Sequence, residues 1–222
     1  MLKVKTCTIP KGTRSATVED TSTTIARKMS NEETKNVLVI HPAADRGTDF
    51  LEDIYVGIDA VVIRGNVSDS LLRKEIARAD KVYLLGHGFG EKGLYGHGRL
   101  IITNEHAEAL RGKMLIGIWC YAQEYFNCHR LDGLFSDMMI SELPEAEYLG
   151  VSATENEINL SNRAYAESIA RALVLFPDNF AAAAFNAKEI YIASAEDPNH
   201  LSEVMKYNSE RVFGRSRERS EL

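Results

Sequence analysis

Short, continuous apolar runs recur along the middle of the chain and alternate with segments of helical periodicity. Residues 37–40, 60–63, 82–85 and 114–118 have the length and composition of strands that are buried on both faces. Residues 148–151 predict a fifth strand. Because strands alternate with helices along the chain, the pattern predicts an α/β fold with a mostly parallel, doubly wound sheet that helices cover on both faces.

The segments between these runs carry apolar residues at helical spacing, and several begin at a residue suited to capping a helix. The candidate N-caps are Thr48, Ser68 and Asn104, for helices over residues 48–56, 68–79 and 104–110. An apolar stripe over residues 131–139 predicts a further helix that ends before Pro144, and residues 162–175 predict another. Residues 99–103 favour a small extra strand.

The order of the strands decides which loops meet. Five strands in this rhythm favour the order 2-1-3-4-5, in which strands 1 and 3 flank the point where the winding reverses. The loops after the first, third and fourth strands then lie side by side, and ligands of such sheets bind outside the carboxyl ends of the strands. We therefore expect Asp45, His87 and Cys120, which lie on these three loops, to converge.

The chain divides into three parts by composition. Residues 1–35 are polar and rich in Ser and Thr, so we expect a loosely held lead-in, whereas residues 36–176 contain the regular α/β pattern. Residues 177–222 form a predicted C-terminal extension in which residues 189–192 fit either a helix or an edge strand. Asn199 is a candidate cap for a last helix, and residues 215–222 predict a flexible tail.

Composition excludes several classes of protein. A net charge of −6 and an isoelectric point near 5.6 argue against nucleic-acid binding. Three cysteines do not make a disulfide framework and fit a reducing compartment. The start of the chain lacks the apolar stretch of a signal peptide, and no apolar run approaches the roughly 20 residues needed to cross a bilayer. We therefore expect a cytoplasmic protein that does not bind a membrane.

Two of the apolar strands lead directly into a reactive side chain. Residues 82–85 continue into Gly86-His87-Gly88, and residues 114–118 continue into Trp119-Cys120. A cysteine thiolate is a nucleophile, and a neighbouring imidazole can take the thiol proton and later protonate a leaving amine. The backbone N–H groups of Gly88 and Cys120 are candidate donors to an oxyanion, since glycine lets the backbone approach a substrate closely.

These residues resemble the caspase-hemoglobinase group of cysteine peptidases, which includes caspases, metacaspases, gingipains and clostripain. The resemblance covers roughly residues 36–175 and lies in an apolar strand ending in His-Gly, a glycine-rich hairpin and a second apolar strand ending in Cys. Asp45-Arg46-Gly47-Thr48-Asp49 is also similar to the Arg-x-Gly-Thr-Asp that follows the first strand of caspases. However, Cys120 lacks the caspase Gln-Ala-Cys-x-Gly context, and the 33 positions between His87 and Cys120 fall short of the caspase spacing of about 50. The chain therefore resembles the wider group and not true caspases.

The resemblance implies a caspase-like fold and a cysteine endopeptidase with a polypeptide substrate. In that group His87 and Cys120 would be the catalytic dyad and Gly88 part of the oxyanion site, with neither a metal nor a cofactor. Asp45 aligns with the caspase arginine that holds an acidic substrate side chain, whereas metacaspases use an acidic residue there and cleave after Arg or Lys. We therefore expect cleavage after Arg or Lys. The alternative is that Asp45 only caps the following helix.

Other interpretations remain open. Cys120 alone fits a buried core residue and His87 a turn residue, and the chain would then be a catalytically silent caspase-like module that binds a regulatory protein partner. A nucleotide-binding regulatory domain is a third option, although the glycines of residues 86–90 lack the dinucleotide spacing. Cys128-His129 with His97 and His106 matches no common zinc pattern.

Overall fold

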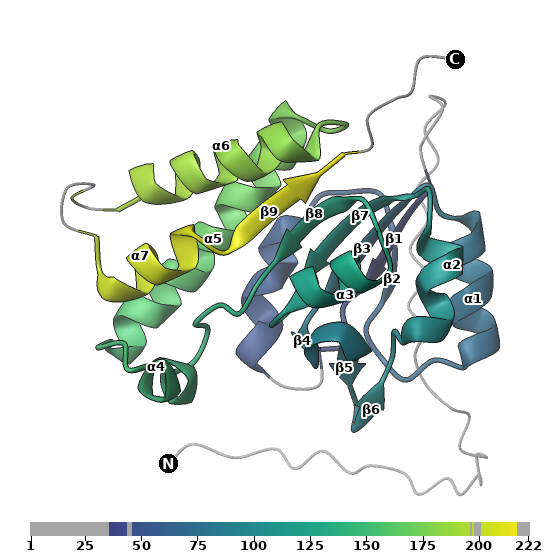
Figure 1. The fold of residues 1–222 in the computed structure, drawn as a ribbon, viewed down its shortest axis with the longest axis horizontal. Helices are drawn as coiled ribbons and strands as arrows, with labels where there is room; N and C mark the ends of the chain where they lie inside the picture. The colour runs from purple at the N-terminus through teal and green to yellow at the C-terminus, as the bar shows by residue number, and fades with distance from the viewer. Residues whose placement is uncertain (1–35, 44–45, 196, 198–200, 217–222) are drawn as a thin grey trace, which may run out of the picture.

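The computed structural model describes residues 36–43, 46–195, 197 and 201–216. Its centre is a six-stranded sheet in the order β2-β1-β3-β7-β8-β9, in which neighbouring strands are parallel except β8 and β9 (Figure 1). The strands are β1 (Val37–Ile40), β2 (Val61–Ile63), β3 (Lys81–Leu85), β7 (Met114–Ile118), β8 (Gly133–Ser136) and β9 (Val212–Arg215). The α/β class and the mostly parallel sheet are thus confirmed.

A smaller antiparallel sheet follows β3 directly. It consists of β4 (His87–Gly88), β5 (Leu94–Gly96) and β6 (Arg99–Leu100), and the short helix η2 (Gly90–Lys92) connects β4 to β5. In Figure 1 this sheet lies below the end of the main sheet. The glycine-rich segment therefore forms a hairpin at the carboxyl end of β3.

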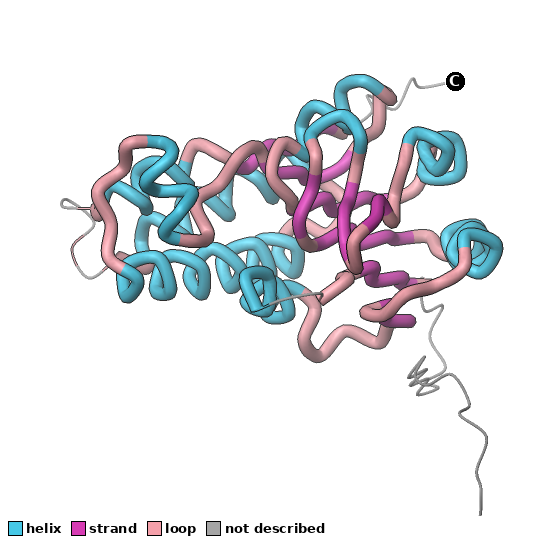
Figure 2. The backbone as a smooth tube through the Cα atoms, turned by 90° about the horizontal axis from the view of Figure 1, so that it is seen from below, coloured by secondary structure: helices cyan, strands magenta, loops and turns pink. Residues whose placement is uncertain are grey.

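Helices cover both faces of the main sheet, and the strands are apolar on both sides for that reason (Figure 2). Leu38 and Leu84 pack on one face, whereas Val39 and Leu85 pack on the other. The first face is covered by α1 (Asp69–Arg78), α2 (Ala107–Leu110) and α3 (Ala122–Cys128). The second is covered by η1 (Arg46–Ile54), α5 (Glu155–Leu175) and α6 (Phe180–Ala193).

Three shorter helices complete the described fold. They are η3 (Asn104–His106), which precedes α2, and α4 (Leu143–Leu149) and α7 (Glu203–Ser209). A small apolar cluster joins α4, the start of α5 and α7 through Ala146, Ile158 and Val204. This cluster lies beyond β8 along the chain and anchors α4 close to the carboxyl end of β7.

The predicted fifth strand at residues 148–151 is wrong, because this segment is the end of α4 and its cap. Gly150 takes a left-handed conformation (φ 68°) that ends the helix, and the Tyr148 side chain is 83% exposed, which a central strand would not allow. The fifth parallel strand is instead β8, within the apolar stripe from which we expected a helix. All four of its residues are buried between β7 and β9. A short apolar run does not distinguish a strand from a buried helix.

Several helix ends also differ from expectation. Thr48 is a buried residue inside η1 and not its cap, and Thr103 and not Asn104 caps η3. Thr154 caps α5, which begins seven residues before its predicted start. The prediction that Ser68 caps α1 is confirmed, since its hydroxyl oxygen accepts from the N–H of Leu71 at 3.3 Å.

The C-terminal segment belongs to the same core. Residues 189–192, for which the sequence left helix and edge strand open, are helical within α6. β9, which lies in the predicted extension over residues 177–222, is the antiparallel edge strand of the main sheet. Arg215, placed in the predicted tail, ends β9 and donates hydrogen bonds to the carbonyl oxygens of Phe126 and Leu131. The predicted lead-in over residues 1–35 and the cap Asn199 lie outside the described residues.

Candidate functional site

The carboxyl ends of β3 and β7 lie side by side and carry the two predicted reactive residues. The strands pair from Lys81 with Met114 to Leu85 with Ile118, and the N–H of Gly86 then donates to the carbonyl oxygen of Ile118 at 3.0 Å. His87 is the second residue after the end of β3, and Cys120 is the second residue after the end of β7. The register therefore brings the backbones of His87 and Cys120 to the same end of adjacent strands.

Gly88 packs directly against the indole ring of Trp119. A Cβ atom at Gly88 would overlap that ring, so only glycine fits this position without a shift of the backbone or the indole. The hydroxyl of Ser136 in turn holds the Trp119 backbone, because it accepts from the Trp119 N–H at 3.0 Å and donates to the Trp119 carbonyl at 2.8 Å. The loops after β3 and β7 and the end of β8 thus form one packed unit.

The turn between β7 and α3 is strained at the residue after Cys120. Tyr121 has φ 65° and ψ 29°, the left-handed region that a bulky side chain rarely adopts. Such backbone outliers persist where the surrounding structure enforces them, and they cluster at functional sites. Cys120 therefore directly precedes a strained residue in the tight turn that leads from β7 into α3.

The thiol of Cys120 faces α4. Its Sγ atom lies 3.6 Å from Oε1 of Glu145, which accepts its hydrogen bond, and it also meets the backbone of Met139. Burial, followed by the negative charge of Glu145, raises the pKa of the Cys120 thiol to about 12. In this arrangement the cysteine is a protonated thiol and not a thiolate at neutral pH.

Glu145 is itself held in place by the turn before α4. Its Oε2 atom accepts from the Ser141 N–H at 2.6 Å, from the Ser141 hydroxyl at 2.9 Å and from the Glu142 N–H at 3.1 Å. These three donors fix the position of the Glu145 carboxyl group beside Cys120. No feature of the sequence pattern had indicated a role for Glu145 or Ser141.

The loop after β1 reaches the same end of the sheet. Pro42 packs on the β3–β4 turn, where it lies 3.7 Å from the place that a Cβ on Gly86 would take. Asp45, the predicted substrate-binding residue, lies outside the described residues. The backbones of the three predicted loops therefore adjoin, although the position of Asp45 itself stays a prediction.

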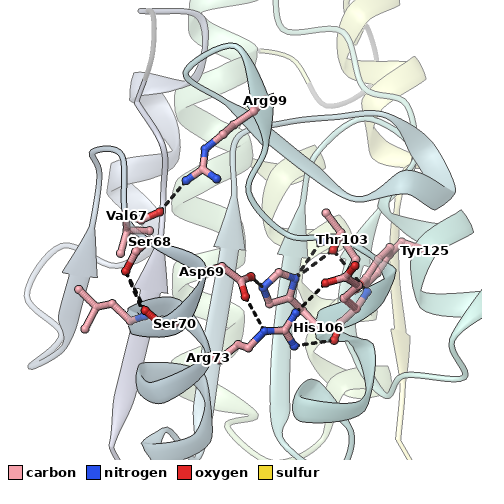
Figure 3. A network of polar contacts seen from close by, with 11 residues as sticks. Val67, Ser68, Asp69, Ser70, Arg73, Arg99, Thr103, His106 and Tyr125 are labelled. Carbon is pink, nitrogen blue, oxygen red and sulfur yellow. Dashed lines mark hydrogen bonds and ion pairs between the residues drawn. The ribbon is translucent and has the colours of Figure 1, made fainter.

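The histidines considered for a zinc site have other partners. His106 is buried beside α1, where its Nδ1 atom accepts from the Thr103 N–H at 3.1 Å and its Nε2 atom lies 3.0 Å from Oδ1 of Asp69 (Figure 3). Arg73 binds the same carboxylate at 2.7 Å, so the cluster joins α1 to η3. Within the described residues no group of three or more His, Cys, Asp and Glu side chains is placed to hold a metal ion.

The glycine-rich hairpin also lacks the surroundings of a phosphate loop. Gly90 has φ 51° and packs against the carboxylate of Glu124, which would repel a phosphate group. The hairpin glycines instead let the β4–β5 turn approach α3 closely.

Comparisons with protein-family models and with curated proteins identify no relative. No protein-family model matches the chain, and no curated protein was found to be similar to it. Among the described helices, none has the length and apolar character required to cross a membrane. The function of this α/β protein is therefore inferred from its own geometry.

Proposed function

We propose that this protein is a cysteine endopeptidase with a caspase-like fold, in which Cys120 is the nucleophile and His87 the general acid and base. The observation that carries the proposal is the placement of His87-Gly88 and Cys120 directly after two paired parallel strands, with Gly88 packed on Trp119. The strained turn at Tyr121 supports it.

The reaction follows from the chemistry of these groups. The imidazole of His87 takes the proton of the Cys120 thiol, and the sulfur attacks the carbonyl carbon of a peptide bond. The oxyanion that forms is stabilised by the backbone N–H groups of Gly88 and Cys120. The C–N bond then breaks, the imidazolium protonates the amine that leaves, and water hydrolyses the thioester to restore the thiol.

The contact between Cys120 and Glu145 opposes formation of the thiolate. A thiol whose pKa lies near 12 yields little thiolate at neutral pH, so catalysis requires the thiol to leave the carboxylate and approach His87. The same contact favours the second candidate function, a catalytically silent caspase-like module that binds a protein partner.

Hydrolysis of a fluorogenic peptide library distinguishes the two functions. We expect the wild type to cleave after Arg or Lys. Cys120→Ala and His87→Ala should lose turnover while they keep the fold. Cys128→Ala, which changes an exposed cysteine, is the control and should keep turnover. If Asp45 binds the basic side chain, Asp45→Ala should lower turnover of Arg substrates about 100-fold with little change in stability. Turnover that persists in Cys120→Ala would refute the mechanism. Absence of turnover in both the wild type and Glu145→Gln would favour the silent module.

A further inference from the structure

The segment that leads from β8 to the end of α4 lies against the thiol of Cys120. Residues 138–149, the strap, contact this thiol at two points, the backbone of Met139 and the carboxyl group of Glu145. The sulfur atom lies 3.6 Å from Oε1 of Glu145, and the turn before α4 holds the other oxygen of Glu145 with three hydrogen bonds. The strap therefore occupies the hydrogen-bonding capacity of the proposed nucleophile.

Side chains of α7 hold the strap in place. Asn208, which is fully buried, binds both backbone groups of Ile140: its Oδ1 atom accepts from the Ile140 N–H at 2.8 Å, and its Nδ2 atom donates to the Ile140 carbonyl oxygen at 2.8 Å. Glu203 accepts from the N–H of Ser152, just beyond the strap, at 2.9 Å. Water can replace these bonds when the strap moves, and the strand pairing of the sheet is not broken.

Apolar packing adds little to this attachment. Ala146 is the buried residue of α4, whereas the Tyr148 side chain is 83% exposed, and α4 lies at the rim of the molecule (Figure 1). The apolar cluster under the strap contains four buried residues, contributed by the strap, α5 and α7. Segments with few buried apolar contacts open at a low free energy. The strap can therefore open while the sheet stays folded.

We propose that the strap is an autoinhibitory element, which holds the Cys120 thiol on Glu145 and frees it when the strap detaches from α7. When the strap opens, Glu145 moves away together with α4, and the sulfur atom loses the negative neighbour that opposes its ionisation. The effect on turnover rests on the proposed peptidase function, whereas the opening of the strap does not.

Alkylation of Cys120 in the Asn208→Ala variant tests the proposal without turnover. The variant removes both hydrogen bonds to Ile140, so the strap should be open more often. At pH 7.5 iodoacetamide should modify Cys120 about tenfold faster than in the wild type, with no change at the exposed Cys128. Peptide mass mapping measures both rates in the same samples. An unchanged rate at Cys120 would overturn the proposal.

Leu72→Ala is the control for general destabilisation. Leu72 is buried in α1 and packs on the face of the sheet opposite to Met139 of the strap. The variant should be less stable than the wild type, but the rate at Cys120 should change less than about twofold, because global unfolding is far rarer than a local opening. An equal increase in Leu72→Ala and Asn208→Ala would show that Cys120 reacts from the unfolded chain and would refute the strap.

A milder pair of variants replaces Asn208→Ala if that protein does not fold. Glu203 is exposed, and Glu203→Ala removes the acceptor of the Ser152 N–H, so the rate at Cys120 should rise about threefold. Glu203→Gln keeps an oxygen that can accept this bond and should retain the wild-type rate. In that case, equal rates in Glu203→Ala and the wild type would overturn the proposal.

Peptide turnover of the same proteins separates this proposal from the peptidase function. Faster alkylation of Cys120 in Asn208→Ala, without turnover by the wild type or the variant, would support the strap and contradict the peptidase. Turnover by the wild type with unchanged alkylation in Asn208→Ala would support the peptidase and refute the strap. If both proposals hold, turnover per folded molecule should increase in Asn208→Ala together with alkylation.

Discussion

Cys120 is the residue on which the proposed chemistry depends, and its surroundings at rest oppose that chemistry. The thiol is buried and hydrogen-bonded to the Glu145 carboxylate, and both features favour the protonated form. At the scale of single residues, the contact between Cys120 and Glu145 is therefore the feature most open to a direct test.

The first prediction concerns the reactivity of Cys120. At pH 7.5 we expect iodoacetamide to alkylate Cys120 far more slowly than the exposed Cys128 of the same chain. Glu145→Gln removes the charge beside the thiol and should raise the alkylation rate of Cys120 about tenfold, as expected for a decrease of one unit in its pKa. Peptide mass mapping at successive times measures both rates.

Glu147→Gln is the control for this prediction, because Glu147 is an exposed carboxylate of the same helix α4. It should leave the rate at Cys120 unchanged. If Cys120 of the wild type reacts faster than Cys128, its thiol is not buried against the Glu145 carboxylate.

The second prediction concerns His41 and the dependence of stability on pH. It is buried at the end of β1, where its ring contacts the Tyr55 hydroxyl at 3.0 Å and the Thr48 carbonyl oxygen at 3.1 Å. Burial, with a smaller contribution from the charge of Arg64, lowers the pKa of His41 from 6.5 to about 4. In the unfolded chain His41 therefore binds a proton below about pH 6.5, whereas in the folded protein it stays neutral down to about pH 4.

Stability should fall as the pH decreases through this window. Urea unfolding should show a loss of about 2 kcal/mol between pH 7 and pH 5 from His41. Burial also lowers the pKa values of His106 and His129, so these two residues add to the loss of stability at low pH. The contribution of His41 is therefore measured by comparing the wild type with His41→Gln. That variant should be less stable at pH 7 and lose less stability on acidification. An identical pH slope in both proteins would contradict the assignment.

At the scale of secondary-structure elements, the contact between Gly88 of β4 and Trp119 after β7 holds the two loops together. A methyl group at Gly88 would overlap the indole ring, so either the backbone of β4 or the ring must move. The third prediction is that Gly88→Ala lowers the free energy of unfolding by about 1–3 kcal/mol.

Gly65→Ala is a suitable control, since no atom lies within 4 Å of the place its Cβ would take. It should change stability by less than about 0.5 kcal/mol. If the proposed function holds, Gly88→Ala should also lower peptide turnover by more than its effect on the folded fraction explains. Chemical unfolding and turnover of the same samples measure the two effects, and a Gly88→Ala protein as stable as Gly65→Ala would contradict the close packing.

For the whole molecule, β9 closes the edge of the main sheet although it lies at the end of the described chain. It pairs with β8, its Gly214 packs against the backbone of Phe180 in α6, and Arg215 binds the carbonyl oxygens that end α3 and precede β8. β9 therefore connects both helical layers to the sheet.

The fourth prediction is that a chain ending at Arg211 is destabilised by about 3 kcal/mol or more, because it loses β9 and exposes β8 as a new edge. A chain ending at Ser216 keeps β9 and the hydrogen bond from the Phe180 N–H to the Ser216 hydroxyl, and it is the control. Thermal unfolding monitored by circular dichroism compares the two chains. Equal melting temperatures would show that β9 does not contribute to the cooperative core.

By itself the sequence determined the α/β class, the strands β1, β2, β3 and β7, and the placement of His87 and Cys120 directly after two of them. These features follow from local signals, because a short apolar run identifies a strand buried on both faces and the next residues necessarily lie at its carboxyl end. The sequence did not distinguish β8 from a helix. Its four residues are apolar or small in either case, and only their pairing with β7 and β9 made them a strand.

Tertiary structure alone decided the state of the thiol. Glu145 lies 25 residues beyond Cys120, and the fold brings it to the sulfur because Gly150, Pro144 and the apolar cluster around Ala146 make residues 143–149 a helix beside the end of β7. Tertiary structure likewise forms a cleft of about 830 Å³ from η1 and the starts of α4 and α5, which are distant in the chain. Sequence patterns report local periodicity, whereas the protonation of a buried group depends on partners that only the packed fold supplies.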